Sequence, residues 1–412
     1  MGCIEEKRWP KSLTAKSYAQ SYEPLKQYVL LEFGILQETN ITVYRKEAKD
    51  FIFDYHGKEF FDGMMPEEED VVFNGNIAPV YSYAEYRDYD VEIGKVYAYW
   101  VSSDNGESKT GPVAVTTRDA RVWWHYDKIM SEMQDMSEKY PDTELVQVGE
   151  TVEHRPLVAI IAGNRENMIA CMGNVHAGES GAEITLSSLR YILENKPELL
   201  EKTGLAVLPS VNADRREEMA TGAPWYIRVN KNGVDINRNF NVDWEEVTYD
   251  YDLSSADPRA VTYKGRYAES EPETKAIIEF IRLTKPKIAL SFHSLCSIAT
   301  DKMLVANEAL SDETDKNKIE AMVRAYSDAF REAFNMPVRK ERISIPSSYP
   351  GVFVRWAYTQ GVYGVDLELN LGDELDYFAV SRRDKTDLEM LEKCIELHRK
   401  AIMALMELQE VN

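Results

Sequence analysis

The sequence contains few cysteines, and their spacing excludes two kinds of structure. Four are present among 412 residues, Cys3, Cys171, Cys296 and Cys394, and no two of them form a Cys-x-x-Cys pair. Disulfide frameworks and cysteine-rich zinc sites both need cysteines that recur at short intervals. We therefore expect reduced thiols.

The chain also lacks a long apolar run. No stretch of about 18 apolar residues, the length needed to span a bilayer, occurs in it. Residues 1–10, Met-Gly-Cys-Ile-Glu-Glu-Lys-Arg-Trp-Pro, contain no apolar core of a signal peptide. We expect no membrane partner and a cytoplasmic protein as the chain stands, or a secreted one if an export signal has been removed from it.

Positive charge is scarce relative to negative charge. The 48 Lys and Arg residues stand against 70 Asp and Glu residues, which gives a formal net charge of −22. A nucleic-acid backbone or an anionic membrane surface attracts proteins with the opposite balance, so we expect neither as a partner. Acid-rich runs such as residues 66–70 are interpreted as solvated loops.

No long low-complexity tract is present, and the chain exceeds the size at which one hydrophobic core stops growing. Two domains are therefore expected, a small one over residues 1–118 and a larger one over residues 119–412. The oligomeric state is left open by the sequence.

The first domain is predicted to be an all-β sandwich with an accessory role. Its readable segments are short and rich in β-branched and aromatic residues: 28–31, 41–44, 96–101 and 111–117. Asn105-Gly106 lies between the last two and is typical of a hairpin turn. This closing hairpin resembles that of a fibronectin type III domain, which implies a small sandwich of that kind.

After residue 118, helical periods alternate with apolar strands. Helices are predicted over 126–140, 181–195, 272–284, 316–334 and 385–407, and strands over 157–162, 168–172, 205–208, 288–292 and 364–369. This alternation predicts an α/β domain with a mixed, mostly parallel sheet flanked by helices. Functional sites in such sheets lie beyond the ends of the strands.

Two histidines occupy such strand ends. His176 and Glu179 follow the strand 168–172 on a short loop, and His293 closes the strand 288–292. A catalytic zinc takes three protein ligands of these types and leaves a fourth position open to water. By itself each is weak evidence, since a histidine at a strand end is more often satisfied by backbone groups. Together they are compatible with one Zn²⁺ per chain, and histidines satisfied by backbone groups remain the alternative at this point. The other histidines are interpreted as surface or packing residues.

A carboxylate in the last strand is the candidate general base. Glu368 stands among apolar residues, where an unpartnered charge is costly. Burial would raise its pKa toward the range useful to a base, and a nearby zinc would lower it. Strand alternation puts Asp366 on the same face, so chemistry alone does not choose between the two.

Between these segments runs the sequence Arg-Val-Asn-Lys-Asn-Gly-Val-Asp-Ile-Asn-Arg-Asn-Phe, residues 228–240. With it, the chain resembles the zinc carboxypeptidase family. Members carry His-x-x-Glu after a strand, an Arg before a Gly-Val-Asp-x-Asn-Arg-Asn run, a later strand-end His and a Glu in a closing strand. All four occur here in that order, and the resemblance covers most of the chain after residue 118. It implies zinc ligation by His176, Glu179 and His293, with Glu368 as the base.

The resemblance also implies roles for the run itself. Asp235 would accept a hydrogen bond from the non-ligating nitrogen of His176. Arg228 would stabilise the developing oxyanion. Asn237 and Arg238 would hold the terminal carboxylate of the substrate, for which a guanidinium is well matched. Each alone would be interpreted as a surface ion pair or a turn.

Two further substrate-binding residues follow from the resemblance. Tyr349 lies in a segment rich in turn formers, from which a mobile tyrosine of the family caps the substrate carboxylate. Its spacing to Glu368 is shorter than in the pancreatic enzymes. Arg355 lies near the position that lines the side-chain pocket, where an arginine would favour an acidic side chain. Its alternative is an exposed arginine beside Trp356.

These residues predict a zinc metallocarboxypeptidase that acts on peptides with a free C-terminal carboxylate. An alternative with the same fold is an amidase or deacylase of cell-wall peptides or acylated amino acids. An alternative of another class is a catalytically silent peptide-binding module, which is disfavoured because ligands, base, arginine and carboxylate clamp are all present.

Overall fold

The computed structural model describes residues 10–48, 64–103, 107–223, 227–246, 253–293, 302–333, 344–368 and 388–408. The chain divides into two units: residues 1–123 with 218–226, and residues 124–217 with 227–412. Among the described residues, Cys171 and Cys394 are buried and form no disulfide. None of the helices in this part of the chain has the length and apolar character of a membrane span. Cys3 and Cys296 lie outside these ranges.

The first unit is a sandwich of two antiparallel sheets. Its strands are β1 (Lys11–Tyr22), β2 (Leu25–Gly34), β3 (Thr39–Glu47), β4 (Val71–Ile77), β5 (Tyr83–Asp88), β6 (Val96–Ser102) and β7 (Thr110–Thr116), with a 3₁₀ turn η1 (Glu68–Asp70). One sheet has the order β1-β2-β5 and the other β4-β3-β6-β7. Alternate residues of both sheets, including Val29, Leu31, Val43 and Tyr99, form one buried core. The predicted small all-β sandwich of antiparallel sheets is confirmed.

The second unit is an α/β domain, as predicted. Its helices are α1 (Tyr126–Lys139), α2 (Gly181–Asn195), α3 (Pro197–Lys202), α5 (Pro272–Thr284), α6 (Glu313–Ala333), α7 (Phe353–Thr359), α9 (Leu388–Glu407) and the first five residues of α4 (Ala213–Ala220). Its strands are β8 (Thr143–Glu150), β9 (Pro156–Ala162), β10 (Met168–Met172), β11 (Gly204–Leu208), β12 (Ile288–Phe292), β13 (Lys302–Ala306), β14 (Ser344–Ser347) and β15 (Tyr363–Glu368). Short 3₁₀ turns are η2 (Ile236–Arg238), η3 (Trp244–Glu246) and η4 (Glu308–Leu310).

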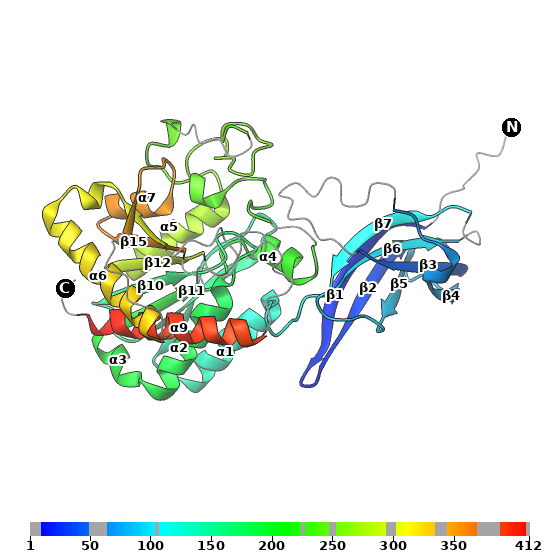
Figure 1. Ribbon diagram of the computed structural model, residues 1–412, viewed down its shortest axis with the longest axis horizontal. Helices are drawn as coiled ribbons and strands as arrows, with labels where there is room; N and C mark the ends of the chain where they lie inside the picture. The colour runs from blue at the N-terminus through cyan, green and yellow to red at the C-terminus, as the bar shows by residue number, and fades with distance from the viewer. Residues whose placement is uncertain are drawn as a thin grey trace. The chain divides into compact units, whose positions relative to one another are not determined.

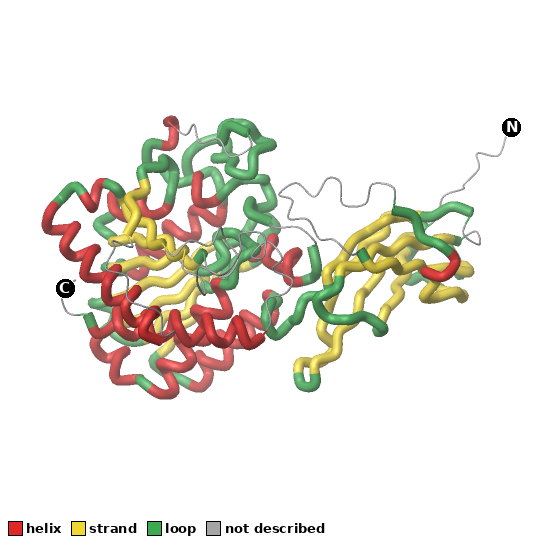
Figure 2. Tube along the Cα trace, in the orientation of Figure 1, coloured by secondary structure: helices red, strands yellow, loops and turns green. Residues whose placement is uncertain are grey.

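Eight strands of this unit form one mixed sheet in the order β14-β13-β15-β12-β10-β11-β9-β8. Its centre, β15-β12-β10-β11, is parallel. Helices α5 and α7 cover one face, and α1, α2, α3 and α9 cover the other (Figure 1). The strands therefore run between two layers of helix, as Figure 2 shows. A sheet covered on both faces needs strands that are apolar throughout, which explains the fully buried β10, β11 and β12.

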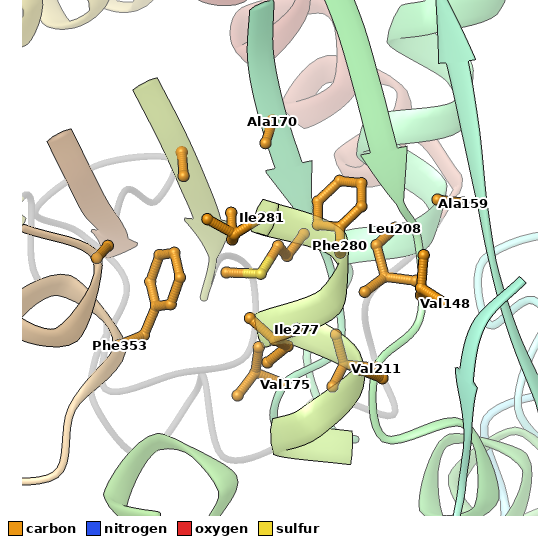
Figure 3. Close-up of a cluster of buried hydrophobic side chains, with 14 of the residues drawn as sticks. Val148, Ala159, Ala170, Val175, Leu208, Val211, Ile277, Phe280, Ile281 and Phe353 are labelled. Atoms are coloured by element: carbon orange, nitrogen blue, oxygen red, sulfur yellow. The ribbon is translucent and has the colours of Figure 1, made fainter. Parts of the chain in front are cut away.

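The core beneath α5 illustrates how this helix is held. Ile277, Phe280 and Ile281 recur at helical spacing and point toward the strand side chains, among them Ala170 and Leu208 (Figure 3). Glycine at residue 149 lets α5 approach β8 closely, because a Cβ there would lie 2.8 Å from the Cβ of Ala276. Tight packing of α5 fixes the parallel strands whose ends carry the candidate ligands.

The segment around residue 345 differs from the sequence-based interpretation. The turn formers of residues 345–351, the segment that carries Tyr349, predict a loop, but Ser344–Ser347 forms β14 and pairs in parallel with β13. Among the described strands, β14 is the outermost on this side of the sheet. Pro346 is compatible with that place because an edge strand has unpaired backbone groups on one side. Tyr349 remains in the loop that follows.

Candidate metal centre

Three neighbouring parallel strands bring the predicted residues to one edge of the sheet. Met172 of β10 stands beside Ser291 of β12, which in turn stands beside Asp366 of β15. His176 follows the end of β10 by four residues, His293 comes directly after β12, and Glu368 is the last residue of β15. His176, His293 and Glu368 therefore lie at the same edge because the parallel pairing aligns the strand ends.

His176, Glu179 and His293 form a compact buried cluster. One ligand atom from each lies within 4.8 Å of the others, and all three side chains are buried. Nδ1 of His176 is 2.9 Å from Oε1 of Glu179, and Nδ1 of His293 is 3.0 Å from Oε2 of the same carboxylate. Both imidazoles therefore turn the same nitrogen toward the one carboxylate.

The opposite nitrogen of each imidazole faces a different set of partners. Nε2 of His176 is 3.1 Å from Oδ1 of Asp235, and Oδ2 of Asp235 accepts a hydrogen bond of 2.8 Å from Nε of Arg228. Nε2 of His293 is 3.0 Å from Oγ of Ser291 and 3.6 Å from Oδ1 of Asp366. Partners on Nε2 leave the lone pair on Nδ1, the side of Glu179.

Charges within the cluster shift the pKa values of its members strongly. Burial alone would raise the pKa of Glu179, but His293 and His176 lower it far below its ordinary value. Burial alone would lower the pKa of His293, but the carboxylates of Glu179 and Asp366 raise it well above 6.5. The site thus favours a positive charge next to Glu179.

Asp235 is buried and remains ionised for a similar reason. Burial alone would raise its pKa, but Arg228, His176 and Arg238 lower it far below its ordinary value. Asp235 lies just before η2, and its Oδ1 also accepts the backbone N–H of Asn237 at 3.0 Å. The Gly-Val-Asp-x-Asn-Arg-Asn run therefore folds so that its aspartate backs His176.

The loop from β10 to α2 is held from behind by a buried arginine of α4. Nη1 of Arg216 donates to the carbonyls of Ala177 at 3.2 Å and Glu179 at 3.1 Å, and Nη2 pairs with the carboxylate of Glu183. The guanidinium is 1% exposed. Sequence reasoning missed this residue, because the run Asp-Arg-Arg-Glu-Glu in which it lies is typical of a solvated helix face.

Glu368 is the last residue of β15 and is half-buried. It lies two residues after Asp366, so the two side chains share a face of the strand. Asp366 itself is buried at 3% exposure and is committed to Asn237, whose Nδ2 donates to its Oδ2 at 3.1 Å. Glu368 is thus the more accessible of the two candidate bases.

The structure brings Arg238 and Tyr349 together. The guanidinium carbon of Arg238 lies 5.6 Å from the centre of the Tyr349 ring, whose residue is 45% exposed. The loop that carries Tyr349 packs closely on the backbone of Arg238. Gly351 in this loop has a φ of +72°, and a Cβ there would lie 2.4 Å from the carbonyl oxygen of Arg238. An exposed aromatic ring over a guanidinium is therefore built into this corner of the site.

Arg355 lies in α7 and is paired within the protein. Its Nε donates to Oε1 of Glu308 at 2.8 Å, and Nη2 pairs with both Glu308 and Asp243. The pKa of Arg355 is raised, first by the hydrogen bond to Glu308. The carboxylates of Glu308 and Asp243 therefore balance the positive charge of Arg355, which the sequence analysis had considered as a partner for an acidic substrate side chain.

The donor set of the cluster fits zinc. Two imidazole nitrogens and one carboxylate are ligands that a catalytic zinc takes, with the fourth position left for water. The hydrogen-bond partners on Nε2 of both histidines are the kind that orient such ligands. The residues that would hold the ion are His176, Glu179 and His293.

The fold and the site together define an α/β protein with a candidate mononuclear metal centre at the strand ends. A sequence model described as zinc carboxypeptidase matches residues 129–388. The chain belongs to the zinc carboxypeptidase family, a family of metal-dependent peptidases.

Individual relatives agree with this assignment. Human mast cell carboxypeptidase A is 30% identical over 190 residues, which cover 41% of this chain and 44% of that protein. Carboxypeptidase E of Caenorhabditis elegans is 27% identical over 240 residues, covering 52% of this chain and 49% of that protein. The chain thus spans less than half the length of these curated relatives. Bovine thrombin-activatable fibrinolysis inhibitor, solved with a tick carboxypeptidase inhibitor, has the same fold: its TM-score is 0.55 at 22% identity, over 69% of this chain and 97% of that one.

Proposed function

We propose that this protein is a zinc-dependent carboxypeptidase that hydrolyses the peptide bond next to a free C-terminal carboxylate. The observation that carries the proposal is the buried convergence of His176, Glu179 and His293, with Asp235 behind His176. The proposal is supported by membership of the zinc carboxypeptidase family.

In this proposal His176, Glu179 and His293 hold one zinc ion, which would supply Lewis-acid activation of water and of the peptide carbonyl. Glu368 is the general base: it takes a proton from the attacking water and gives it to the amine that leaves. Its half-buried place at the end of β15 supports this role, because a base must reach both water and substrate.

Arg228 and Arg238 are proposed to meet the negative charges of the reaction. Arg228 is 19% exposed beside Asp235, so its guanidinium can face a developing oxyanion from the solvent side. Arg238 would bind the terminal carboxylate of the peptide with Tyr349 above it and with the second N–H of Asn237. For Arg355 we propose no role toward an acidic side chain, because Glu308 and Asp243 already balance its charge.

The test combines zinc analysis with peptides that differ only at the C-terminus. We expect about one zinc per chain in the wild type and in Glu368→Gln, and release of the last residue from free-acid peptides by the wild type only. Loss of a general base lowers the rate by about 10²–10⁴-fold. Glu279→Gln, the same substitution at a partly exposed position of α5, is the matched control and should keep full activity.

Peptides with an amidated C-terminus are the second control and should be poor substrates. If amidated and free peptides are hydrolysed equally, the carboxylate clamp is contradicted and the amidase alternative is favoured. If zinc binds but cell-wall peptides and acylated amino acids are the only compounds cleaved, the substrate class is contradicted. If the wild-type chain binds no zinc when it is supplied, the proposed function fails.

A further inference from the structure

Asp366 has a buried carboxylate oxygen that the proposed reaction does not use. Its Oδ2 accepts the hydrogen bond from Asn237, whereas its Oδ1 accepts none from the described residues and lies 3.6 Å from Nε2 of His293. Burying a carboxylate oxygen without a donor is unfavourable, so such an atom calls for a reason. The group that it faces is the outer nitrogen of a candidate zinc ligand.

Asn237 connects this carboxylate with the one behind the other histidine. Its backbone N–H donates to Oδ1 of Asp235 at 3.0 Å, and its side-chain Nδ2 donates to Asp366 at 3.1 Å. Its Oδ1 accepts the backbone N–H of Phe353 at 2.8 Å, which fixes the orientation of the amide. One asparagine therefore holds in place both carboxylates that face the two imidazoles.

We propose that Asp366 is a positioning residue that prepares His293 for zinc and that Asn237 holds it in place for this task. The inference rests on the proposed zinc-dependent function. A carboxylate beside Nε2 favours the tautomer that carries hydrogen there and leaves the lone pair on Nδ1, next to Glu179.

Ser291 does not settle the tautomer by itself. Its hydroxyl lies 3.0 Å from Nε2 of His293, and a hydroxyl can either accept a hydrogen or donate its own. The negative charge of Asp366 decides between these two arrangements because it disfavours a bare lone pair on Nε2. Asp366 thus orients His293 as Asp235 orients His176. Its oxygen lies 3.6 Å from Nε2 of its histidine, compared with 3.1 Å for Asp235.

The same contacts argue against Asp366 as the general base. Its two oxygens face Asn237 and the outer nitrogen of His293, on the side of the ring away from Glu179. A general base must come within hydrogen-bond reach of the substrate or its water. These contacts favour Glu368, the base that the family resemblance implies, where the chemistry of the strand alone does not choose between Asp366 and Glu368.

The experiment measures the zinc dissociation constant of the full chain by competition with a chromophoric chelator. In Asp366→Asn the amide oxygen can keep the bond from Asn237, and the amide N–H then faces His293 and favours hydrogen on the wrong nitrogen. We expect zinc to bind about 10–100-fold more weakly, the usual effect of losing such a partner.

Two other aspartates calibrate this measurement. Asp235→Asn removes the carboxylate behind His176 and should weaken zinc binding to a similar or larger degree. Asp88→Asn replaces a buried aspartate of the sandwich unit, which is bonded to Arg45 and Tyr99, and should lower stability without changing the zinc affinity. Ser291→Ala combined with Asp366→Asn should give less than the product of the single effects, because both act through one nitrogen.

The outcomes separate the two proposals. A wild-type chain that binds no zinc contradicts the proposed function and this inference together. Equal zinc affinity of wild type and Asp366→Asn, with weakened binding in Asp235→Asn, overturns the inference alone. If Asp366→Asn does not fold, Asn237→Ala removes the donor that holds Asp366 and should weaken zinc binding about fivefold. An unchanged affinity in that variant overturns the inference as well.

Discussion

The strand-end region around His293 and the core beneath α9 each contain a buried histidine, and the pKa values of these two histidines shift in opposite directions. His293 is 1% exposed and His398 is 0% exposed. Carboxylates around His293 raise its pKa well above 6.5, whereas burial lowers the pKa of His398 to about 3. Equal burial thus favours the charged form in one region and the neutral form in the other.

The two regions meet at a single strand end. The ring of His398 lies 5.3 Å from that of Phe292 and 4.9 Å from that of Phe330, and its Nδ1 is 2.7 Å from the hydroxyl of Tyr326. Phe292, which directly precedes His293, thus packs against the histidine of the core. Whether a buried histidine serves as a ligand or as packing is decided by its neighbours.

The largest expected effect comes from changing each histidine to glutamine. His293→Gln should lose stoichiometric zinc and lower peptide hydrolysis by about 10³-fold or more, since several kcal/mol of metal assistance are removed. His398→Gln should keep both and lose about 1–3 kcal/mol of unfolding free energy, since a buried partner is changed. Zinc analysis, peptide assays and urea denaturation measure these quantities. Loss of zinc in His398→Gln would remove the distinction between the two regions.

A smaller effect is expected on lowering the pH. The pKa of His398 falls from 6.5 to about 3 on folding, so its contribution to stability is present above pH 6.5 and is lost as the unfolded chain takes up a proton below that value. At pH 5 this amounts to about 2 kcal/mol, from 1.36 kcal/mol per pH unit. Urea denaturation at pH 7 and at pH 5 measures the unfolding free energy of both proteins. Between these pH values, His398→Gln should lose about 2 kcal/mol less unfolding free energy than the wild type. An equal loss of unfolding free energy in the wild type and in His398→Gln would contradict this role of His398.

The smallest effect is expected for Tyr326→Phe. The substitution removes the hydroxyl beside His398 and should lower the unfolding free energy by about 1 kcal/mol, as for one buried hydrogen bond. Zinc content and peptide hydrolysis should stay at wild-type values. A drop in zinc affinity would show that the core beneath α9 and the strand-end site are coupled.

The sequence predicted the long helices and the central strands of the second unit. The helices over 181–195 and 272–284 and the strand over 288–292 have the predicted ends, because apolar periodicity and proline near the helix start are local signals. The short helices α3, α4 and α7 and the strands β13 and β14 were not predicted. The pairing of β14 with β13 depends on a distant segment, and the residues of β14 alone are typical of a loop.

The residues of the candidate site were predicted from their order in the sequence. The hydrogen bonds and ion pairs that hold these residues in place were not predicted. His176, Glu179 and His293 could be proposed from their places at strand ends. The pair Arg216–Glu183 and the bond between Asn237 and Asp366 join residues 33 and 129 positions apart. Local sequence patterns do not predict such contacts, because Arg, Glu, Asn and Asp are each equally typical of a solvated surface.

The sequence by itself determined the two classes of domain, the family and the residue types that can hold zinc, because periodicity and motif spacing are properties of the chain. Only the tertiary structure decided which of two carboxylates on one strand face lies beside Nε2 of His293, and which buried histidine has its pKa lowered. Those outcomes depend on the charges and donors that folding places around each group, and these come from distant parts of the chain.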